Sequence, residues 1–326
     1  MPSADNGRAR PRRKPIGLRP VRLETAGWLL AVMVDCMTVD EALTEISAVL
    51  GLGLRLDGPL SGGEQNGAHL LRTAEGRLLV LKLQAVAAKA DRVLRAAPAV
   101  AYAAEGGWPV ARWLWVGRLA NGTAFVIQEH LIGQPIAHLD RETTQTILAA
   151  NQRQAGLAWT DAVDDSAQLQ AVLDGDCTWK AAVARHTPAG ADLISHGDEV
   201  VARAGAPAIP VDDVVHGDYS TSNMILTARG NVSFVDCETI GKGSRVRDLA
   251  DLHRQCFVYP GATTAAMSLI RAHACAVAGP QIFATCTVAV SYNNLAWWVE
   301  NKSKTEFDAV CSRLHHLFNA VEQLVE

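Results

Sequence analysis

Carboxylate, amide and imidazole side chains bracket two short apolar segments in the stretch VVHGDYSTSNMILTARGNVSFVDCE. His216, Asp218 and Asn223 precede the first apolar segment, and Asp236 follows the second. An Ala-Arg-Gly-Asn turn joins the segments, so residues 224–235 are predicted to form a β-hairpin. Groups that can bind metals and move protons therefore gather at the outer ends of an otherwise apolar hairpin.

The open end of this hairpin is predicted to bring Asn223 and Asp236 together. In an antiparallel ribbon the start of the first strand lies beside the end of the second, although these residues are 13 positions apart. One amide oxygen and one carboxylate suit an octahedral Mg²⁺ that takes its other ligands from waters and phosphates. Asp218, five residues before Asn223, is within reach of the same space and is expected to orient or deprotonate a hydroxyl group.

Short antiparallel strands are predicted upstream of this hairpin, from residue 54 to residue 131, with one helix at about 86–104. The strongest turn signal is the Asn-Gly pair at 121–122. Beyond residue 131 the apolar spacing is helical, and the hairpin is the only clear β element. The predicted helices of this half are 141–159, 178–186, 191–204, 263–278, 281–301 and 305–325.

The composition is that of a globular protein with a sizeable core. The chain has 326 residues, of which 49% are hydrophobic and 20% charged, and this length favours two domains or lobes. The net charge of −4 argues against binding to nucleic acid or to an acidic membrane. Seven widely spaced cysteines without a CxxC pair favour reduced thiols in a cytoplasmic protein over a disulfide framework or a zinc site.

Residues 1–36 differ from the rest of the chain because they are rich in Arg and Pro. They are interpreted as a disordered basic arm or as the result of a misassigned start codon. The apolar run AGWLLAVMV within them is too short to span a bilayer, and it leaves a signal peptide as an alternative. The folded part is predicted to begin near Met37, where Thr38 is placed to cap an amphipathic helix.

The sequence HGDYSTSN resembles the H-x-D-x-x-x-x-N catalytic loop of the protein-kinase-like fold, and FVDCE stands where that fold has its metal-binding Asp. Gly217 after the His, and the lack of a DFG sequence, are similar to the aminoglycoside phosphotransferase family of small-molecule kinases. The resemblance implies an α+β fold of two lobes. A small antiparallel sheet with one helix, residues 37–131, would bind the nucleotide. A mainly helical lobe, residues 132–326, would carry the catalytic hairpin and the acceptor-binding helices.

The resemblance also implies roles for individual residues. Asp218 would be the catalytic base, Asn223 and Asp236 would hold Mg²⁺, and Lys82 would hold the α- and β-phosphates of ATP or GTP. The other nucleotide contacts would be a glycine-rich loop and the backbone of a hinge, formed respectively by Ser61, Gly62 and Gly63 and by Gln128, Glu129 and Leu131.

Two further residues are expected to support the catalytic loop rather than to react. His216 is interpreted as a hydrogen-bonding brace in preference to a proton carrier, and Asp248 as an anchor of the following helix against the loop. Glu238 fits a second-shell metal residue and a simple loop acid equally well. The helix after Lys82 lacks an obvious Glu to pair with it, and Asp91 is the nearest candidate.

The implied function is transfer of the γ-phosphoryl group of ATP or GTP to a hydroxyl of a small molecule. An antibiotic such as an aminoglycoside is the first candidate acceptor. The alternatives are a metabolite kinase of the choline, homoserine or sugar type, and a nucleotide-binding pseudokinase. Gly217 cannot receive an activation-loop phosphate, so regulation of that kind is not expected. The oligomeric state stays open.

An acceptor contact is expected in the segment SYNNLAWWVENK. Helical spacing would place Asn293, Trp297 and Glu300 on one stripe, at i, i+4 and i+7. An amide, an aromatic face and a carboxylate together would suit a cationic acceptor. The alternative is a packed Trp with a solvated Glu at its rim.

Overall fold

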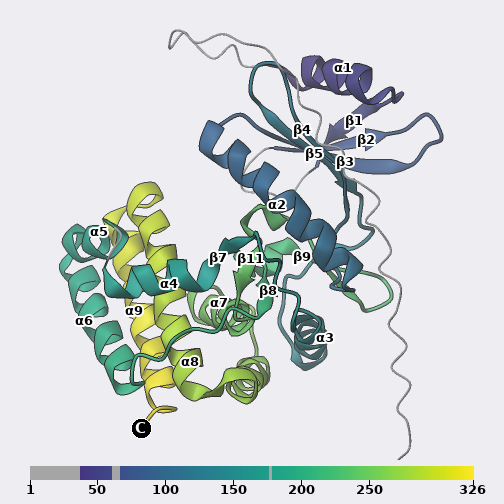
Figure 1. The fold of residues 1–326 in the computed structure, drawn as a ribbon. Coiled ribbons are helices and arrows are strands. Elements are labelled where there is room, and N and C mark those ends of the chain that lie inside the picture. Colours follow the sequence, from purple (N-terminus) through teal and green to yellow (C-terminus); the bar gives the residue numbers. More distant parts are fainter. Residues whose placement is uncertain (1–36, 61–66, 176–177) are drawn as a thin grey trace, which may run out of the picture.

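A five-stranded antiparallel sheet forms the core of the smaller lobe (Figure 1). The computed structural model describes residues 37–60, 67–175 and 178–326. The strands follow the order β1-β2-β3-β5-β4 across the sheet. Their bounds are Arg55–Pro59 for β1, Ala68–Arg72 for β2, Leu78–Gln84 for β3, Trp113–Arg118 for β4 and Ala124–Glu129 for β5. The sheet matches the strands predicted from residue 54 to residue 131.

Two helices cover this sheet, α1 (Val39–Leu50) and α2 (Ala87–Glu105). They pack on opposite faces because the buried residues of the central strands alternate. Phe125 and Ile127 of β5 belong to the apolar cluster of α1, whereas Val126 belongs to the cluster that contains α2. The lobe thus has one helix more than the resemblance implies, and the extra helix is the one predicted after Met37.

The predicted cap of α1 is confirmed by a reciprocal pair of hydrogen bonds. The Thr38 hydroxyl accepts from the Glu41 N–H at 3.3 Å, and the Glu41 carboxylate accepts from the Thr38 N–H at 2.8 Å. The expectation for residues 1–36 concerns a segment outside the described residues, as does the expected role of Ser61, Gly62 and Gly63.

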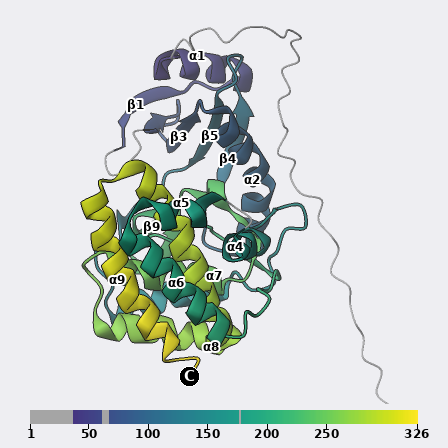
Figure 2. The ribbon, with the colours of Figure 1, turned by 90° about the vertical axis from the view of Figure 1, so that its left-hand side faces the viewer.

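The larger lobe is mainly helical (Figure 2). Its helices are α3 (Arg141–Gln152), α4 (Asp165–Asp174), α5 (Thr178–His186), α6 (Pro188–Arg203), α7 (Val246–Val258), α8 (Thr264–Asn301) and α9 (Lys304–Glu322). Gly279, with φ 83°, interrupts α8 just before Pro280, which explains why the sequence predicts two helices there. Helix α4 was not predicted, since its ten residues contain only two buried apolar side chains, Leu169 and Val172.

The predicted hairpin is confirmed. It consists of β9 (Met224–Leu226) and β10 (Val232–Phe234), with Met224 opposite Phe234. Strand β6 (Gln134–Pro135) pairs with β9. A separate three-stranded sheet is formed by β7 (Val163–Asp164), β8 (Asp213–Val215) and β11 (Gly241–Gly243). Strand β11 pairs with both β7 and β8. Because β8 leads directly into the catalytic loop and β11 follows the hairpin, this pairing holds both ends of the segment between them.

Helix α8 is the only helix in the described part of the chain that is long and apolar enough to cross a membrane by length and composition. More than half of its apolar stretch is buried. Phe283, Cys286 and Leu295 have no exposed surface and belong to the main apolar cluster together with α7 and α9. These are the features of a central core helix.

His253 of α7 is a buried titratable group in this core. Its ring centroid lies 5.2 Å from that of Phe257 and 5.4 Å from that of Phe283. Its Nδ1 atom has no hydrogen-bond partner among the described residues. Burial, with a smaller effect from the charge of Arg271, lowers the pKa of His253 to about 4.

We predict that acid weakens the fold partly through His253. An unfolded histidine has a pKa of about 6.5, so as the pH falls the unfolded chain binds this proton before the folded chain does. The contribution of His253 to the free energy of unfolding is complete above about pH 6.5, and it falls by about 2 kcal/mol by about pH 5. His253→Phe should remove about that much of the acid-induced drop in the free energy of unfolding, measured by denaturant titration. His316→Phe, at an exposed position of α9, is the control. Equal acid sensitivity of His253→Phe and the wild type would contradict this prediction.

Candidate active site

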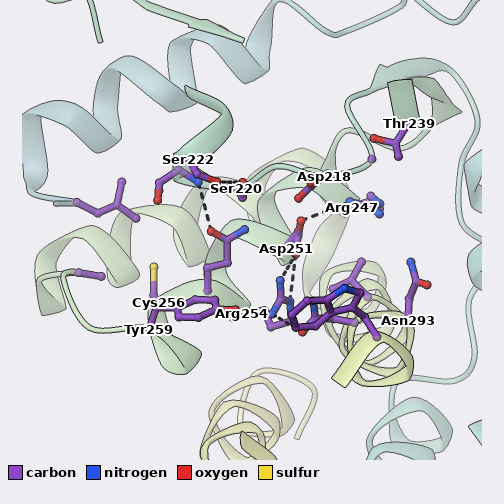
Figure 3. Close-up of a pocket in the computed structure, with 18 of the residues that line it drawn as sticks. Asp218, Ser220, Ser222, Thr239, Arg247, Asp251, Arg254, Cys256, Tyr259 and Asn293 are labelled. Atoms are coloured by element: carbon purple, nitrogen blue, oxygen red, sulfur yellow. Dashed lines mark hydrogen bonds and ion pairs between the residues drawn. The ribbon is translucent and has the colours of Figure 1, made fainter. Parts of the chain in front are cut away.

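Two cavities meet between the lobes. The sheet-side cavity, of about 1120 Å³, is lined by residues of β3, β5 and the hairpin, among them Lys82 and Asp236. The helix-side cavity, of about 640 Å³, is lined by residues of the catalytic loop, α7 and α8, among them Asp218 (Figure 3). Ser222 and Glu238 line both cavities, so the two adjoin at the hairpin.

Asn223 and Asp236 lie next to each other at the open end of the hairpin, as the antiparallel geometry predicts. The Val235 N–H donates to the Asn223 carbonyl at 2.9 Å, one position beyond the last strand pair. The Asn223 Nδ2 donates to the Asp218 carbonyl at 3.1 Å and to the Asp218 Oδ2 at 3.0 Å. The Asn223 amide oxygen and the Asp236 carboxylate are therefore the hard oxygen atoms that a Mg²⁺ ion would need at this position.

Lys82 reaches the hairpin from the sheet. Its neighbours Leu81 and Leu83 on β3 pack toward α1, and the alternation of the strand turns Lys82 toward the sheet-side cavity. Its Nζ lies 2.7 Å from the Asp236 Oδ1. Asp91, the nearest acid on α2 and the sequence-based candidate partner, pairs instead with Arg118 of β4.

Glu238 completes a pair of carboxyl groups with Asp236. Burial would raise the pKa of Asp236, but the Lys82 charge and a hydrogen bond with Glu238 keep it below its usual value. Burial and the Asp236 charge raise the pKa of Glu238 to about 7. Glu238 thus contacts Asp236 at the boundary of the two cavities and is not an isolated loop acid.

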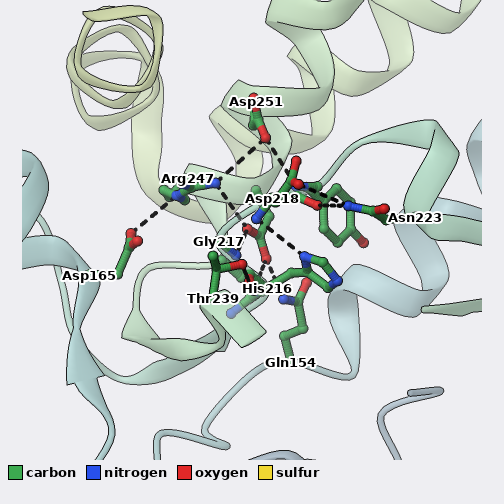
Figure 4. A network of polar contacts seen from close by, with 12 residues as sticks. Gln154, Asp165, His216, Gly217, Asp218, Asn223, Thr239, Arg247 and Asp251 are labelled. Carbon is green, nitrogen blue, oxygen red and sulfur yellow. Dashed lines mark hydrogen bonds and ion pairs between the residues drawn. The ribbon is translucent and has the colours of Figure 1, made fainter. Parts of the chain in front are cut away.

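Asp248 holds the start of the catalytic loop through hydrogen bonds. Figure 4 shows His216, Gly217 and Asp218 of this loop close to Gln154. Its side chain has no exposed surface and accepts hydrogen bonds from the backbone N–H groups of His216 and Gly217, at 2.8 and 3.2 Å. It also accepts from the Gln154 Nε2 at 2.6 Å. Gln154 was not singled out from the sequence, because its link to Asp248 spans 94 positions.

His216 uses both ring nitrogens within the fold. Its Nδ1 accepts from the Asp218 N–H at 3.2 Å, and its Nε2 donates to the Val235 carbonyl at 2.8 Å. These two bonds assign the Nε2–H tautomer, since a backbone N–H needs an acceptor and a carbonyl needs a donor. The geometry suits a brace and leaves no ring nitrogen for proton transfer.

A buried ion network on α7 lies next to the catalytic loop and was not predicted from the sequence. Arg247 pairs with Asp165 at 3.2 Å, and Arg254 donates to Asp251 at 2.7 and 3.0 Å. Asp251 also accepts from the backbone N–H of Tyr219 at 3.0 Å. The alternation of charge in VRDLADLHR, at helical spacing, is the signal that could have revealed it.

Asp218 itself faces the helix-side cavity. Burial raises the pKa of Asp218, and the nearby Asp251 charge adds to the shift. A higher pKa makes the carboxylate a better proton acceptor, while the bond from Asn223 fixes its orientation. The arrangement can activate a hydroxyl group next to the Asn223 and Asp236 side chains.

The predicted hinge residues Gln128, Glu129 and Leu131 line the sheet-side cavity. Gln128 is buried, and its Oε1 has no hydrogen-bond partner among the described residues. The Glu129 carboxylate lies near Arg77, at 3.6 Å, on the outer side of the sheet.

The predicted acceptor stripe is only partly placed at a cavity. Asn293 and Trp297 line the helix-side cavity, but Glu300 is exposed and is not among its lining residues. The Lys302 Nζ already lies 5.5 Å from the centroid of the Trp297 ring. The structure therefore gives Glu300 no part in the amine contact that the spacing predicts, because the cavity ends before that turn of α8.

Solved structures share this two-lobed fold. An aminoglycoside-3'-phosphotransferase of type VIII is 20% identical, with 76% of this chain and 98% of that chain covered and a TM-score of 0.54. The macrolide 2'-phosphotransferase MphH from Brachybacterium faecium is 15% identical, with coverage of 84% and 97% and a TM-score of 0.59. Amicoumacin kinase hAmiN, in complex with AMP-PNP, Ca²⁺ and Ami, is 13% identical, with coverage of 88% and 93% and a TM-score of 0.55.

No curated protein matches this chain significantly. A family model does match, and it covers the sheet, the hinge, the catalytic loop, the hairpin and the first part of α8. It is described as the phosphotransferase enzyme family, APH, and it matches residues 58–286. Since this match includes more than half of the sequence, the chain belongs to the phosphotransferase enzyme family.

Proposed function

We propose that this protein transfers the γ-phosphoryl group of ATP or GTP to a hydroxyl group of a small molecule, in a reaction that requires Mg²⁺. One observation carries the proposal: Lys82, Asn223, Asp218 and Asp236 converge from three segments of the chain where the two cavities adjoin. This is the set of groups that phosphoryl transfer needs, namely a phosphate clamp, metal ligands and a base for the attacking hydroxyl.

The sheet-side cavity is the proposed nucleotide site. Val80 and Val126 give it apolar walls, and the backbone from Gln128 to Leu131 forms its edge. Lys82 and Asp236, in contact at 2.7 Å, are placed to hold the two parts of a magnesium–nucleotide complex, the amine for phosphate and the carboxylate for metal. When bound, Mg²⁺ would neutralise negative charge on the transferred phosphoryl group. The AMP-PNP and Ca²⁺ in the amicoumacin kinase structure support such a site.

Asp218 is the proposed base. It lines the helix-side cavity, where an acceptor hydroxyl would lie, and its raised pKa favours uptake of the hydroxyl proton. His216 cannot share this role because both its nitrogens are engaged. Most of the rate enhancement would then come from positioning and charge stabilisation, as is general for phosphoryl transfer.

An antibiotic is the first candidate acceptor. The names of the similar structures support it, since they include an aminoglycoside phosphotransferase, a macrolide phosphotransferase and an amicoumacin kinase. These acceptors differ in charge and shape, so the chemical class has to be inferred from the cavity of this chain. An ADP-release assay with aminoglycosides, macrolides, peptide antibiotics, amino alcohols and hydroxy acids tests the function and identifies the acceptor.

Asp218→Ala and Asp236→Ala should separate the base from the metal site. We expect Asp218→Ala to lower acceptor-dependent ADP release at least about a hundredfold while nucleotide affinity stays within about threefold. Asp236→Ala should abolish the Mg²⁺-dependent part of nucleotide binding, measured by calorimetry. Asp57→Ala, which removes an acid paired with Arg72 at the far edge of the sheet, is the control. Wild-type turnover in both site variants would refute the assignment.

Gly217→Ala should impair turnover through the backbone alone. Gly217 has φ +84°, and an added Cβ would lie 2.4 Å from the Thr239 carbonyl oxygen, so the catalytic loop would have to shift. We expect at least about a tenfold fall in turnover, since small misplacements of reacting groups are costly. Gly230→Ala is the matched control, because Gly230 has φ +75° but its Cβ would meet nothing within 4 Å. Equal turnover of the two variants would show that the loop tolerates the shift.

A further inference from the structure

The helix-side cavity is lined by more cations than acids. It has three acids, which are Asp218, Glu238 and Asp251. It has four cations, which are Lys89, Arg92, Arg247 and Arg254. Whether a ligand can use these charges depends on which of them the protein already neutralises.

The acids are all engaged within the protein. Asp251 accepts two hydrogen bonds from Arg254 and one from the Tyr219 backbone. Glu238 contacts Asp236 at the boundary with the sheet-side cavity. Asp218 is the proposed base. No acid of this cavity is free to bind a cationic acceptor.

The two cations of α2 are not engaged. Lys89 and Arg92 are exposed, and neither forms an ion pair or side-chain hydrogen bond with any residue in the described ranges. They lie three positions apart and so share one face of the helix. Helix α2 packs against the turn that contains Glu238 and Thr239, which brings this face over the catalytic loop.

These cations serve the acceptor side and not the nucleotide side. Lys89 and Arg92 line the helix-side cavity with Asp218, and neither is among the residues that line the sheet-side cavity with Lys82. On an open surface such a pair would be solvated and would gain little from an anion. An anion held in the helix-side cavity would meet both charges at once, so their attractions would add.

Other features of the cavity also disfavour a cationic acceptor. The Trp297 ring, which could have received an amine, already has the Lys302 Nζ over it. Arg254 of the cavity wall donates to the Asn294 side chain, which also accepts from the indole of Trp298. A polycationic ligand would meet the free charges of Lys89 and Arg92 without a free carboxylate to offset them.

We propose that the acceptor is a hydroxyl compound with an anionic group, a carboxylate or a phosphate ester, and that Lys89 and Arg92 bind this group while the hydroxyl faces Asp218. The inference rests on the proposed function and specifies its acceptor class. It replaces the cationic acceptor expected from the stripe on α8.

The test measures binding to the full chain with its nucleotide site filled by Mg²⁺ and AMP-PNP. The probes are gluconate, the neutral polyol sorbitol, inorganic phosphate and the polycation kanamycin, each titrated calorimetrically. We expect gluconate to bind at least about tenfold more tightly than sorbitol and kanamycin, with the preference decreasing as salt is added. The double variant Lys89→Gln/Arg92→Gln should reduce the gluconate-to-sorbitol ratio to about one and leave AMP-PNP affinity unchanged.

Arg95→Gln is the matched control for Arg92→Gln. Arg95 lies on α2, is exposed and carries the same charge, but it is not among the residues that line the helix-side cavity. Arg92→Gln should weaken gluconate binding, and Arg95→Gln should not. A phosphate ester as the natural group is indicated if inorganic phosphate binds more tightly than gluconate with the same dependence on Lys89 and Arg92.

The outcomes separate this inference from the proposed function. If AMP-PNP binds with Mg²⁺ and Asp236→Ala abolishes that binding, the kinase assignment stands whatever the acceptor probes do. The anionic acceptor is then refuted if kanamycin binds more tightly than gluconate, if the double variant keeps the gluconate preference, or if neither gluconate nor phosphate binds. If AMP-PNP fails to bind, the proposed function fails and this inference fails with it.

Discussion

The buried carboxylate of Asp248 is the constraint on which the geometry of the site depends. A carboxylate without exposed surface is stable only where donors satisfy it, and this one accepts from the backbone of His216 and Gly217 and from Gln154. Two of the three donors belong to the loop that carries Asp218, the proposed base. The hydrogen bonds that satisfy Asp248 therefore also fix the backbone beside Asp218. Each unsatisfied donor would cost about 1–3 kcal/mol, which is why the loop cannot move independently of α7.

Uncommon backbone conformations occur on both sides of the hairpin. Gly217 has φ +84°, and Asp236 has φ 63°, a left-handed conformation that costs a residue with a side chain about 1 kcal/mol or more. Bonds to Val235 oppose this strain, because Asn223 accepts from its N–H and His216 donates to its carbonyl. The strained turn directs the Asp236 carboxylate to Lys82, a residue 154 positions earlier.

The sequence was sufficient where the controlling signal is local. Strand alternation, the turn signals and the catalytic-loop motif predict the sheet, the hairpin and the convergence of Asp218, Asn223 and Asp236.

The sequence was insufficient where partners are distant or elements are short. Strands β7, β8 and β11 have two or three residues and no readable period. The pairing of Arg247 with Asp165 spans 82 positions, and helical spacing could not show where along α8 the cavity ends. The choice of Lys82 between Asp91 and Asp236 is likewise a tertiary outcome.

The cleft combines cations of the smaller lobe with carboxylates of the larger lobe. The smaller lobe supplies the cations Lys82, Lys89 and Arg92, and the larger lobe supplies the carboxylates Asp218 and Asp236. A magnesium–nucleotide complex needs both, since its phosphates seek the first set and its metal the second. An acceptor with an anionic group and a hydroxyl would likewise contact both lobes. The acceptor would then bind most tightly in the conformation that brings α2 over the catalytic loop. Because that conformation also aligns the reacting groups, acceptor binding would favour it.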